Sequence, residues 1–237
     1  MPSNESTAFA VDELRIFSSL RKAGFQPEVI FDIGAGNGAW SATVSQVFPD
    51  SRYHLFEPLA EIRDDYRKPL SYWMGIHPSF VLHPIALGSS EESVAMHTDA
   101  SGYGSTILDI GVHPAFQNRV DVAQYPLDEY VRSKGIDPPD ILKLDTQGAE
   151  RLILSQAQKC LEYAKIVFAE TWFIRGYGPQ TPLLSEIVEI LSAADFIMAE
   201  LGHRFYDEIH GLYSCDAFFL KRDFLKSVAP AMPSGIW

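Results

Sequence analysis

Carboxylate side chains stand at or near the ends of four separate apolar runs in this chain. They are Asp32, Glu57, Asp145 and Glu170. The carboxyl ends of parallel strands meet at one edge of an open sheet, which is where such sheets bind ligands. A carboxylate at this edge can accept hydrogen bonds from ribose hydroxyls or take a proton from a reacting hydroxyl. The sequence therefore indicates a binding or catalytic site with several acidic groups.

A glycine-rich segment follows the first of these runs. The apolar residues of 29–33, broken only by Asp32, lead into glycines at alternate positions, Gly34, Gly36 and Gly38. Glycine tolerates positive φ angles and lets the backbone come within contact distance of a ligand. The pattern predicts a buried strand that enters a nucleotide-cradling turn, with a helix directly behind it.

The glycine turn is compatible with two cofactors. Gly34-x-Gly36-x-x-Ala39 satisfies the relaxed dinucleotide fingerprint of NAD-binding proteins. Asp32 favours S-adenosylmethionine, because a sulfonium tolerates a carboxylate beside the turn, whereas a pyrophosphate gains nothing from one. Asp32 is expected to hold the turn through backbone N–H groups or to face the amino-acid part of the cofactor through water. Glu57, 23 positions after Gly34, can accept both ribose hydroxyls of either cofactor.

Short apolar runs alternate with helical patterns along most of the chain. Runs that predict strands cover 29–33, 53–56, 80–87, 141–144, 166–169, 196–201 and 212–220. The clearest helical patterns cover 7–23, 39–47 and the residues after a cap at Thr181 and a first turn at Pro182. The alternation predicts an α/β fold with a parallel, doubly wound sheet. The last two runs lie too close for a crossover helix, so they are expected to pair antiparallel.

The segment 88–126 is long for a connection between a strand and the next helix. Its runs 94–97 and 119–124 are expected to form the arms of an added β element, with the glycine-rich residues 101–106 as a turn between them. We expect this insertion to form a lid over the carboxyl edge of the sheet and to contribute to substrate binding.

Composition and length limit the classes of fold and partner. A chain of 237 residues with 46% hydrophobic content can bury a substantial core, and 1–237 is predicted to be a single domain with an N-terminal helix in 1–24. A formal charge of −12 repels phosphate backbones and anionic lipids, so neither nucleic acid nor a membrane surface is an expected partner. The expected partner is a small molecule. The sequence carries no prediction of the oligomeric state.

Cysteine usage and the N-terminus predict a cytoplasmic protein. Cys160 and Cys215 lie far apart and lack the spacing of a metal site, which suits a reducing compartment. The first residues lack the basic and apolar regions of a signal peptide, and no apolar run reaches the length of a membrane span.

Five segments together resemble the FkbM-type S-adenosylmethionine-dependent methyltransferases. In chain order they are Ile30–Gly38, Leu55–Pro58, Pro84–Gly88, Pro126–Tyr130 and Leu142–Glu150. The resemblance covers roughly 25–221, nearly the whole chain. It implies a class I, Rossmann-like methyltransferase fold of about seven strands with the last one antiparallel. It also implies methyl transfer to a hydroxyl of a sugar or natural-product small molecule.

The resemblance also implies which residues hold the cofactor. The predicted S-adenosylmethionine-binding residues are Asp32, Gly34, Ala35, Gly36, Asn37, Gly38, Glu57, Pro58, Ala86, Leu87 and Asp145. Among these, Glu57 would hold the ribose, Ala86 and Leu87 would lie beside the adenine, and Asp145 would lie near the transferred methyl group. Many members have Glu where this chain has Gln147, so this position supplies hydrogen bonds but neither a charge nor a general base.

Methyl transfer to a weakly acidic hydroxyl requires positioning of the acceptor and removal of its proton. The predicted catalytic residues are Asp145, Glu170 and His203. Asp145 and Glu170 could alternatively hold Mg²⁺ as a second cofactor, although no complete set of metal ligands is identified. Tyr103 and Tyr177 could line a pocket or merely pack their loops. Two further classes stay open, an NAD-binding oxidoreductase and a catalytically silent S-adenosylmethionine-binding module.

Overall fold

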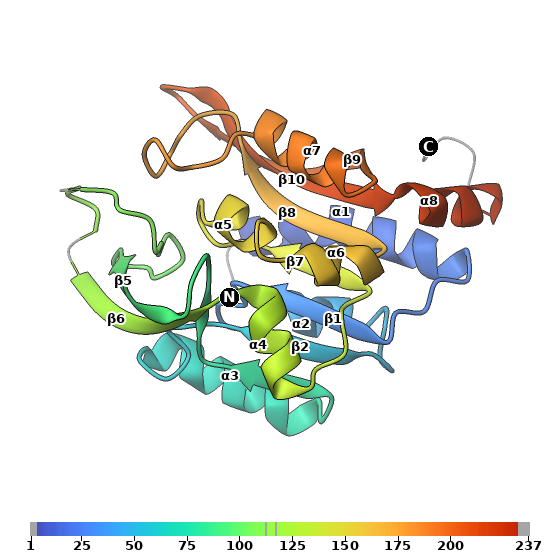
Figure 1. The fold of residues 1–237 in the computed structure, drawn as a ribbon, viewed down its shortest axis with the longest axis horizontal. Helices are drawn as coiled ribbons and strands as arrows, with labels where there is room; N and C mark the ends of the chain where they lie inside the picture. Colours follow the sequence, from blue (N-terminus) through green and yellow to red (C-terminus); the bar gives the residue numbers. More distant parts are fainter. Residues whose placement is uncertain (1–3, 112, 117, 232–237) are drawn as a thin grey trace.

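The fold is built around a central sheet whose strands follow the predicted apolar runs. The computed structural model describes residues 4–111, 113–116 and 118–231, with side chains in the first helix from Glu13 onward. Within these residues the sheet has seven strands (Figure 1). In spatial order they are β3 (Phe80–His83), β2 (Arg52–Phe56), β1 (Val29–Ile33), β7 (Ile141–Leu144), β8 (Ile166–Trp172), β10 (Gly211–Lys221) and β9 (Phe196–Asp207).

Strand directions confirm the predicted doubly wound sheet. Strands β3, β2, β1, β7 and β8 are parallel, while β10 runs antiparallel between β8 and β9. From β1 the chain proceeds to β2 and β3 on one side, and later to β7 and β8 on the other. The order therefore reverses between β1 and β7. A crevice at the carboxyl ends of these two strands is the usual ligand site of such a sheet.

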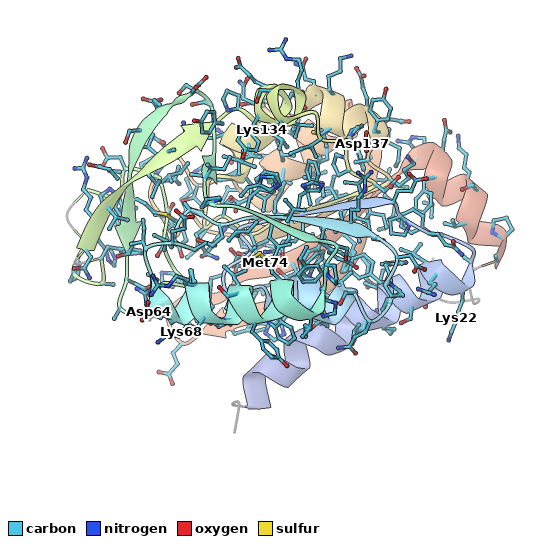
Figure 2. All side chains as sticks on the ribbon, turned by 90° about the horizontal axis from the view of Figure 1, so that it is seen from below. Lys22, Asp64, Lys68, Met74, Lys134 and Asp137 are labelled. Carbon is cyan, nitrogen blue, oxygen red and sulfur yellow. The ribbon has the colours of Figure 1, made fainter. Side chains whose placement is uncertain are left out.

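Helices cover both faces of the sheet. One face carries α1 (Asn4–Lys22), α2 (Ala39–Val44), α3 (Asp64–Ile76) and α8 (Arg222–Val228), which is followed by the short 3-10 helix η1 (Ala229–Ala231). The other face carries α4 (Leu127–Lys134), α5 (Glu150–Leu154), α6 (Gln158–Tyr163) and α7 (Leu184–Ala193). Figure 2 shows α3, with Asp64, Lys68 and Met74, on the side of the sheet opposite to Lys134.

Each face has its own hydrophobic core because side chains alternate along a strand. In β1, Ile30 packs into the core beneath α1, whereas Phe31 and Ile33 pack into the core beneath α4 and α5. A strand buried on both sides needs apolar residues throughout, which explains the continuous apolar runs of the sequence. Among the described residues, none of the helices combines the length and apolar character of a membrane span.

The segment 88–126 contributes most of a second, smaller sheet, as predicted. This sheet contains β4 (Ala86–Leu87), β6 (Asn118–Tyr125) and β5 (Glu92–Thr98), in that order, and lies beside the β2–β3 side of the central sheet (Figure 1). Strands β5 and β6 pair antiparallel from Glu92–Gln124 to Thr98–Asn118. The predicted arms 94–97 and 119–124 are the central parts of these two strands.

Several predicted boundaries were wrong. The expected strand over 80–87 is two strands in different sheets, because Pro84 has no N–H to continue a ladder. The helix expected to be capped at Thr181 starts only at Leu184, and the Thr181 hydroxyl accepts a hydrogen bond from the N–H of Tyr177 instead. The helix expected over 39–47 ends at Val44, beyond which the backbone forms tighter i→i+3 bonds.

Strands β8 and β9 are longer than the apolar patterns indicate. Strand β8 extends to Trp172, so Glu170 lies inside the strand. Strand β9 extends six residues past Leu201 to Asp207, and its exposed outer half pairs with β10. Hydrogen bonding to a neighbouring strand, which a single run of sequence does not reveal, sets both ends.

Candidate active site

A cleft opens at the carboxyl ends of β1, β2 and β7, where the strand order reverses. It contains about 630 Å³ of empty space, part of which is open to solvent. Seven of the predicted cofactor residues line it: Gly34, Gly36, Glu57, Pro58, Ala86, Leu87 and Asp145. The sheet edge thus brings together residues that are up to 111 positions apart in the sequence.

The turn after β1 lies directly against the end of β7. A Cβ atom on Gly34 would stand 1.8 Å from the backbone oxygen of Asp145, and Gly34 has a φ of +75°. The N–H of Gly34 also donates to the carbonyl of Phe56 in β2, at 3.0 Å. Only glycine fits between these two strand ends, and the glycine holds the turn close to both.

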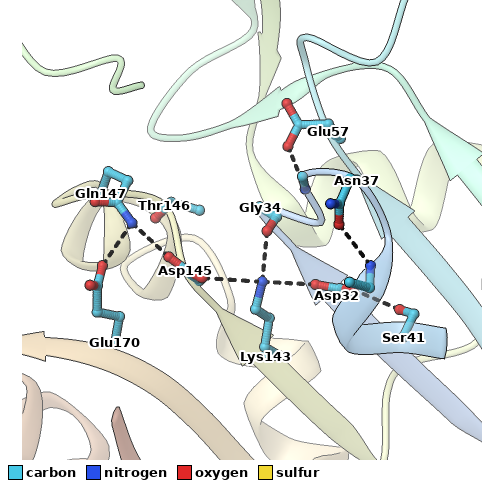
Figure 3. A network of polar contacts seen from close by, with 12 residues as sticks. Asp32, Gly34, Asn37, Ser41, Glu57, Lys143, Asp145, Thr146, Gln147 and Glu170 are labelled. Carbon is cyan, nitrogen blue, oxygen red and sulfur yellow. Dashed lines mark hydrogen bonds and ion pairs between the residues drawn. The ribbon is translucent and has the colours of Figure 1, made fainter. Parts of the chain in front are cut away.

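Glu57 is a buried carboxyl group at the end of β2. It is 4% exposed, and its side chain accepts a hydrogen bond from the N–H group of Gly36 at 2.8 Å (Figure 3). It also accepts a hydrogen bond from the N–H group of Leu59 at 2.9 Å. Burial raises the pKa of Glu57 to about 7, while the two backbone donors limit the rise. A carboxylate at this place in the cleft can accept hydrogen bonds from neighbouring hydroxyl groups.

Asp32 lies beneath the glycine turn rather than in the cleft. Its carboxylate accepts a hydrogen bond from the hydroxyl of Ser41 at 2.7 Å and pairs with Lys143 Nζ at 2.9 Å (Figure 3). Lys143 Nζ also donates to the carbonyl of Gly34, at 2.6 Å. Burial opposes the charge on Lys143, but the carboxylates of Asp32 and Asp145 raise its pKa above the ordinary value. Asp32 therefore supports the turn through the lysine, whereas we had expected it to do so through backbone N–H groups.

Three other predicted cofactor residues support the turn without lining the cleft. Ala35 is 6% exposed. Gly38 lies against α3, where a Cβ atom would stand 3.0 Å from Leu70. Asn37 accepts the N–H of Ala39 at the start of α2 through its side-chain oxygen, at 3.0 Å.

The turn after β7 is held from inside the protein by Glu150. This side chain is fully buried, and its Oε1 accepts hydrogen bonds from both the N–H and the hydroxyl of Thr146, at 2.9 and 3.0 Å. Within the turn, Gln147 adopts a left-handed φ of +54°, a conformation that costs energy in a residue other than glycine and that clusters at functional sites.

The side chain of Gln147 joins two of the predicted catalytic carboxylates. Its amide nitrogen donates to Asp145 at 2.8 Å and to Glu170 at 2.9 Å (Figure 3). Its amide oxygen accepts the hydroxyl proton of Tyr177. Since an amide has two N–H hydrogens, both are used, and the two carboxylates are bridged by a neutral group.

Glu170 lies deeper than Asp145. Glu170 is 8% exposed, whereas the side chain of Asp145 is 42% exposed and faces the cleft. Burial, followed by the charge of Asp145, raises the pKa of Glu170 well above its ordinary value. Asp216 in β10 lies opposite Glu170 in the strand register. Asp216 was not predicted, although a carboxylate inside an apolar strand is itself a signal, because such groups are seldom buried without a function or a partner.

His203 is not among the residues that line the cleft. It lies in β9, and β10 separates β9 from β8. Adjacent strands are about 4.8 Å apart, so His203 is about 10 Å from the β8 backbone in the plane of the sheet. The structure brings Asp145 and Glu170 together but does not bring His203 to them.

Among the described residues, no group of three or more His, Cys, Asp or Glu side chains is arranged to hold a metal ion. The amide group of Gln147 takes the position between Asp145 and Glu170 that a bridging cation would need. The donor set therefore does not fit the Mg²⁺ that we considered from the sequence.

The comparisons with known proteins connect this site to a family. The model of the Methyltransferase FkbM domain matches residues 32–204, more than half of the chain. Among solved structures, the methyltransferase FkbM from Methylobacillus flagellatus KT superposes with a TM-score of 0.55 at 16% sequence identity. The match covers 82% of this chain but only 43% of that longer protein. At this identity, the likeness shows the fold alone.

Two further solved structures have lower scores. Magnesium protoporphyrin IX methyltransferase from Synechocystis PCC 6803 with bound SAH has a TM-score of 0.49 at 11% identity, covering 93% of this chain and 88% of that one. Precorrin-6y C5,15-methyltransferase from Geobacter metallireducens GS-15 has a TM-score of 0.45 at 13% identity, covering 88% and 89%. Comparison with the curated proteins returns no match. The family model spans most of the chain, from β1 into β9, and the protein therefore belongs to the FkbM methyltransferase family.

Proposed function

We propose that this protein binds S-adenosylmethionine in the cleft and transfers its methyl group to a hydroxyl of a small molecule, such as a sugar or a natural product. The observation that carries this proposal is the shared cleft of the glycine turn, Glu57 and Asp145. In this arrangement Glu57 accepts the ribose hydroxyls, and Ala86 and Leu87 form an apolar surface for the adenine. The methionine part then extends toward Asp145.

The acceptor hydroxyl must lose a proton as its oxygen attacks the sulfonium methyl group. Asp145 is the carboxylate best placed to take this proton, because it lines the cleft and is partly exposed. Gln147 fixes the direction of the carboxylate by donating to its Oδ1, and Lys143 lies 3.6 Å from its Oδ2. Glu170 helps to position Asp145 indirectly, because it accepts a hydrogen bond from the same Gln147 amide that donates to Asp145.

We also propose that the protein works in the cytoplasm as one domain with a small-molecule acceptor. Both cysteines are free and buried, which suits a reducing compartment. The net charge of −12 disfavours phosphate-rich partners.

Calorimetric titration with S-adenosylhomocysteine and, separately, with NAD tests the cofactor. We expect S-adenosylhomocysteine to bind and NAD to give no heat of binding. Glu57→Gln keeps the size of the side chain but removes its charge. It should lower the affinity for S-adenosylhomocysteine by about tenfold, since a hydrogen bond to a charged group contributes about 1.5–3 kcal/mol. Binding of NAD without S-adenosylhomocysteine would contradict the proposal and favour an oxidoreductase.

Transfer of a labelled methyl group to a panel of sugar and natural-product alcohols tests the reaction. At saturating cofactor, Asp145→Asn should transfer the methyl group at least 100-fold more slowly than the native protein, as expected for loss of a general base. Asp50→Asn, at an exposed site on the opposite edge of the sheet, is the matched control and should transfer at the native rate. Cofactor binding without transfer to any alcohol would indicate a silent binding module.

A further inference from the structure

The insertion forms one wall of the same cleft that the glycine turn and Glu57 line. Its residues there come from β5 and from the loop that follows β5: Met96, Gly102, Tyr103, Ser105 and Ile107. None of the five segments that resemble the family includes these residues. A segment that contributes to the cofactor cleft is positioned to contact the cofactor itself.

The loop 99–105 is fixed at its first end. The carboxylate of Asp99 accepts hydrogen bonds from the N–H of Gly102 and the hydroxyl of Ser101, at 2.5 and 2.7 Å. The guanidinium group of Arg63, which comes just before α3, donates to the carbonyls of Ala100 and Ser101 at 3.3 Å.

The loop is fixed at its second end by Thr106, which is fully buried. Its backbone exchanges two hydrogen bonds with His97 in β5, at 2.8 and 3.0 Å. Its hydroxyl donates to the backbone oxygen of Gln147, at 2.8 Å. The loop is thereby attached to the turn that carries Asp145, and its position is coupled to that turn.

Tyr103 stands at the tip of this loop and reaches across to the glycine turn. Its hydroxyl accepts a hydrogen bond from the side-chain amide of Asn37, at 3.0 Å. Its ring carbon Cε1 is 3.9 Å from the place of a Cβ atom on Gly36. The ring is nevertheless 59% exposed. Gly102, with a φ of +82°, and Gly104 flank it, so the backbone can bend at the tip without side-chain hindrance.

We propose that Tyr103 is a cofactor-binding residue, which the insertion places against the glycine turn so that its ring forms a wall of the cleft beside Gly36 and packs against the bound cofactor. This inference rests on the proposed function. An aromatic ring supplies a large apolar surface with few rotatable bonds, so it can cover a ligand at a low entropic cost. The Asn37 hydrogen bond holds the ring in this position, so its loss is expected to accelerate release of the bound cofactor.

S-adenosylhomocysteine is the probe, with affinity measured by calorimetry and the dissociation rate by stopped-flow displacement. Tyr103→Ala, which removes the ring, should weaken affinity by at least tenfold. Tyr103→Phe, which removes only the hydrogen bond, should raise the dissociation rate by about threefold to tenfold, the range for one neutral hydrogen bond. Tyr72→Ala is the matched control, since Tyr72 in α3 is 61% exposed and does not line the cleft. Its affinity should stay within twofold of the native value.

The results separate this inference from the proposed function. If the native protein does not bind S-adenosylhomocysteine, the proposed function fails and the inference fails with it. If the native protein binds the probe and the affinity of Tyr103→Ala changes by less than threefold, the proposed function stands and the role of Tyr103 is refuted. If the dissociation rate of the probe from Tyr103→Phe rises by less than threefold, the hydrogen bond to Asn37 is not what retains the cofactor. Melting temperatures of the variants should match the native protein, because Tyr103 belongs to a half-exposed loop tip.

Discussion

Replacing Lys143 by methionine should destabilise the protein far more than the loss of a surface ion pair. The side chains of Lys143 and Asp32 are 4% and 0% exposed, and their charged atoms are 2.9 Å apart. Methionine keeps the apolar stem of lysine but leaves the Asp32 carboxylate buried without a counter-charge. Breaking a buried pair in this way typically costs about 3–5 kcal/mol, a large share of the roughly 5–15 kcal/mol that stabilises a domain.

Urea unfolding at pH 7, followed by far-UV circular dichroism, measures this loss as a change in the free energy of unfolding. Arg132→Met is the control, because Arg132 pairs with Glu129 at 3.8 Å on an exposed surface. An exposed pair contributes about 0–1 kcal/mol. The double variant Asp32→Asn/Lys143→Met removes the unpaired charge and should recover part of the stability lost in the single lysine variant.

The reasoning fails if Lys143→Met costs no more than the Arg132 control, since the lysine would then not be neutralising a buried charge. It also fails if the double variant is as unstable as Lys143→Met. That result would mean that the lost stability comes from the hydrogen bond of Lys143 to the carbonyl of Gly34, and not from Asp32.

Three further predictions concern the glycine turn, the cofactor and two buried histidines. At Gly24 the φ is +95° and a Cβ atom would meet nothing within 4 Å, so Gly24→Ala should lower the free energy of unfolding by about 1–2 kcal/mol. Gly34→Ala should lower it by at least ~2 kcal/mol more, because the added Cβ atom would collide with the backbone of Asp145 at the end of β7. Equal losses of the two variants in urea unfolding would contradict this reasoning. Because burial raises the pKa of Glu57 to about 7, affinity for S-adenosylhomocysteine should rise with pH through 7 in calorimetry, and Glu57→Gln should abolish the dependence. Burial lowers the pKa of both His54 and His83, whose rings are hydrogen-bonded at 2.9 Å, to about 4. The neutral rings therefore contribute stability above pH 6.5, and the free energy of unfolding should fall by up to about 3 kcal/mol for each ring as the pH falls toward 4. The His54→Phe variant should show a smaller fall in the same acid titration.

Local sequence signals predicted the parts of the fold that depend on a few neighbouring residues. The apolar run 29–33 and the alternate glycines after it predicted β1 and its turn, because burial on both faces and close backbone approach each require specific residue types. Glu57 was placed in the cleft for a similar reason. The second strand ends there, and all parallel strands that end at one edge deliver their next residues to the same crevice.

Features that depend on strand register were missed. Asp32 and Lys143 are Cα partners in the register of β1 and β7, so their pairing requires knowledge of which strands are adjacent. The same holds for Asp216, which meets Glu170 only because β10 inserts beside β8. His203 was selected because it follows an apolar run, but that run is the outermost strand, away from the cleft.

Asp32 and Asp145 show how one residue type acquires two roles at neighbouring strand ends. Both lie within 4 Å of Lys143 Nζ. Asp32 points down into the protein and is fully covered, so its charge is neutralised and it holds the turn. Asp145 lies past the end of β7 and keeps 42% of its side chain exposed, as the role of general base that we propose for it requires. Lys143 is the sequence feature that distinguishes them. A lysine between two leucines in a buried strand needs a carboxylate on the same face of the sheet. The adjacent strand β1 places Asp32 on that face, directly opposite Lys143.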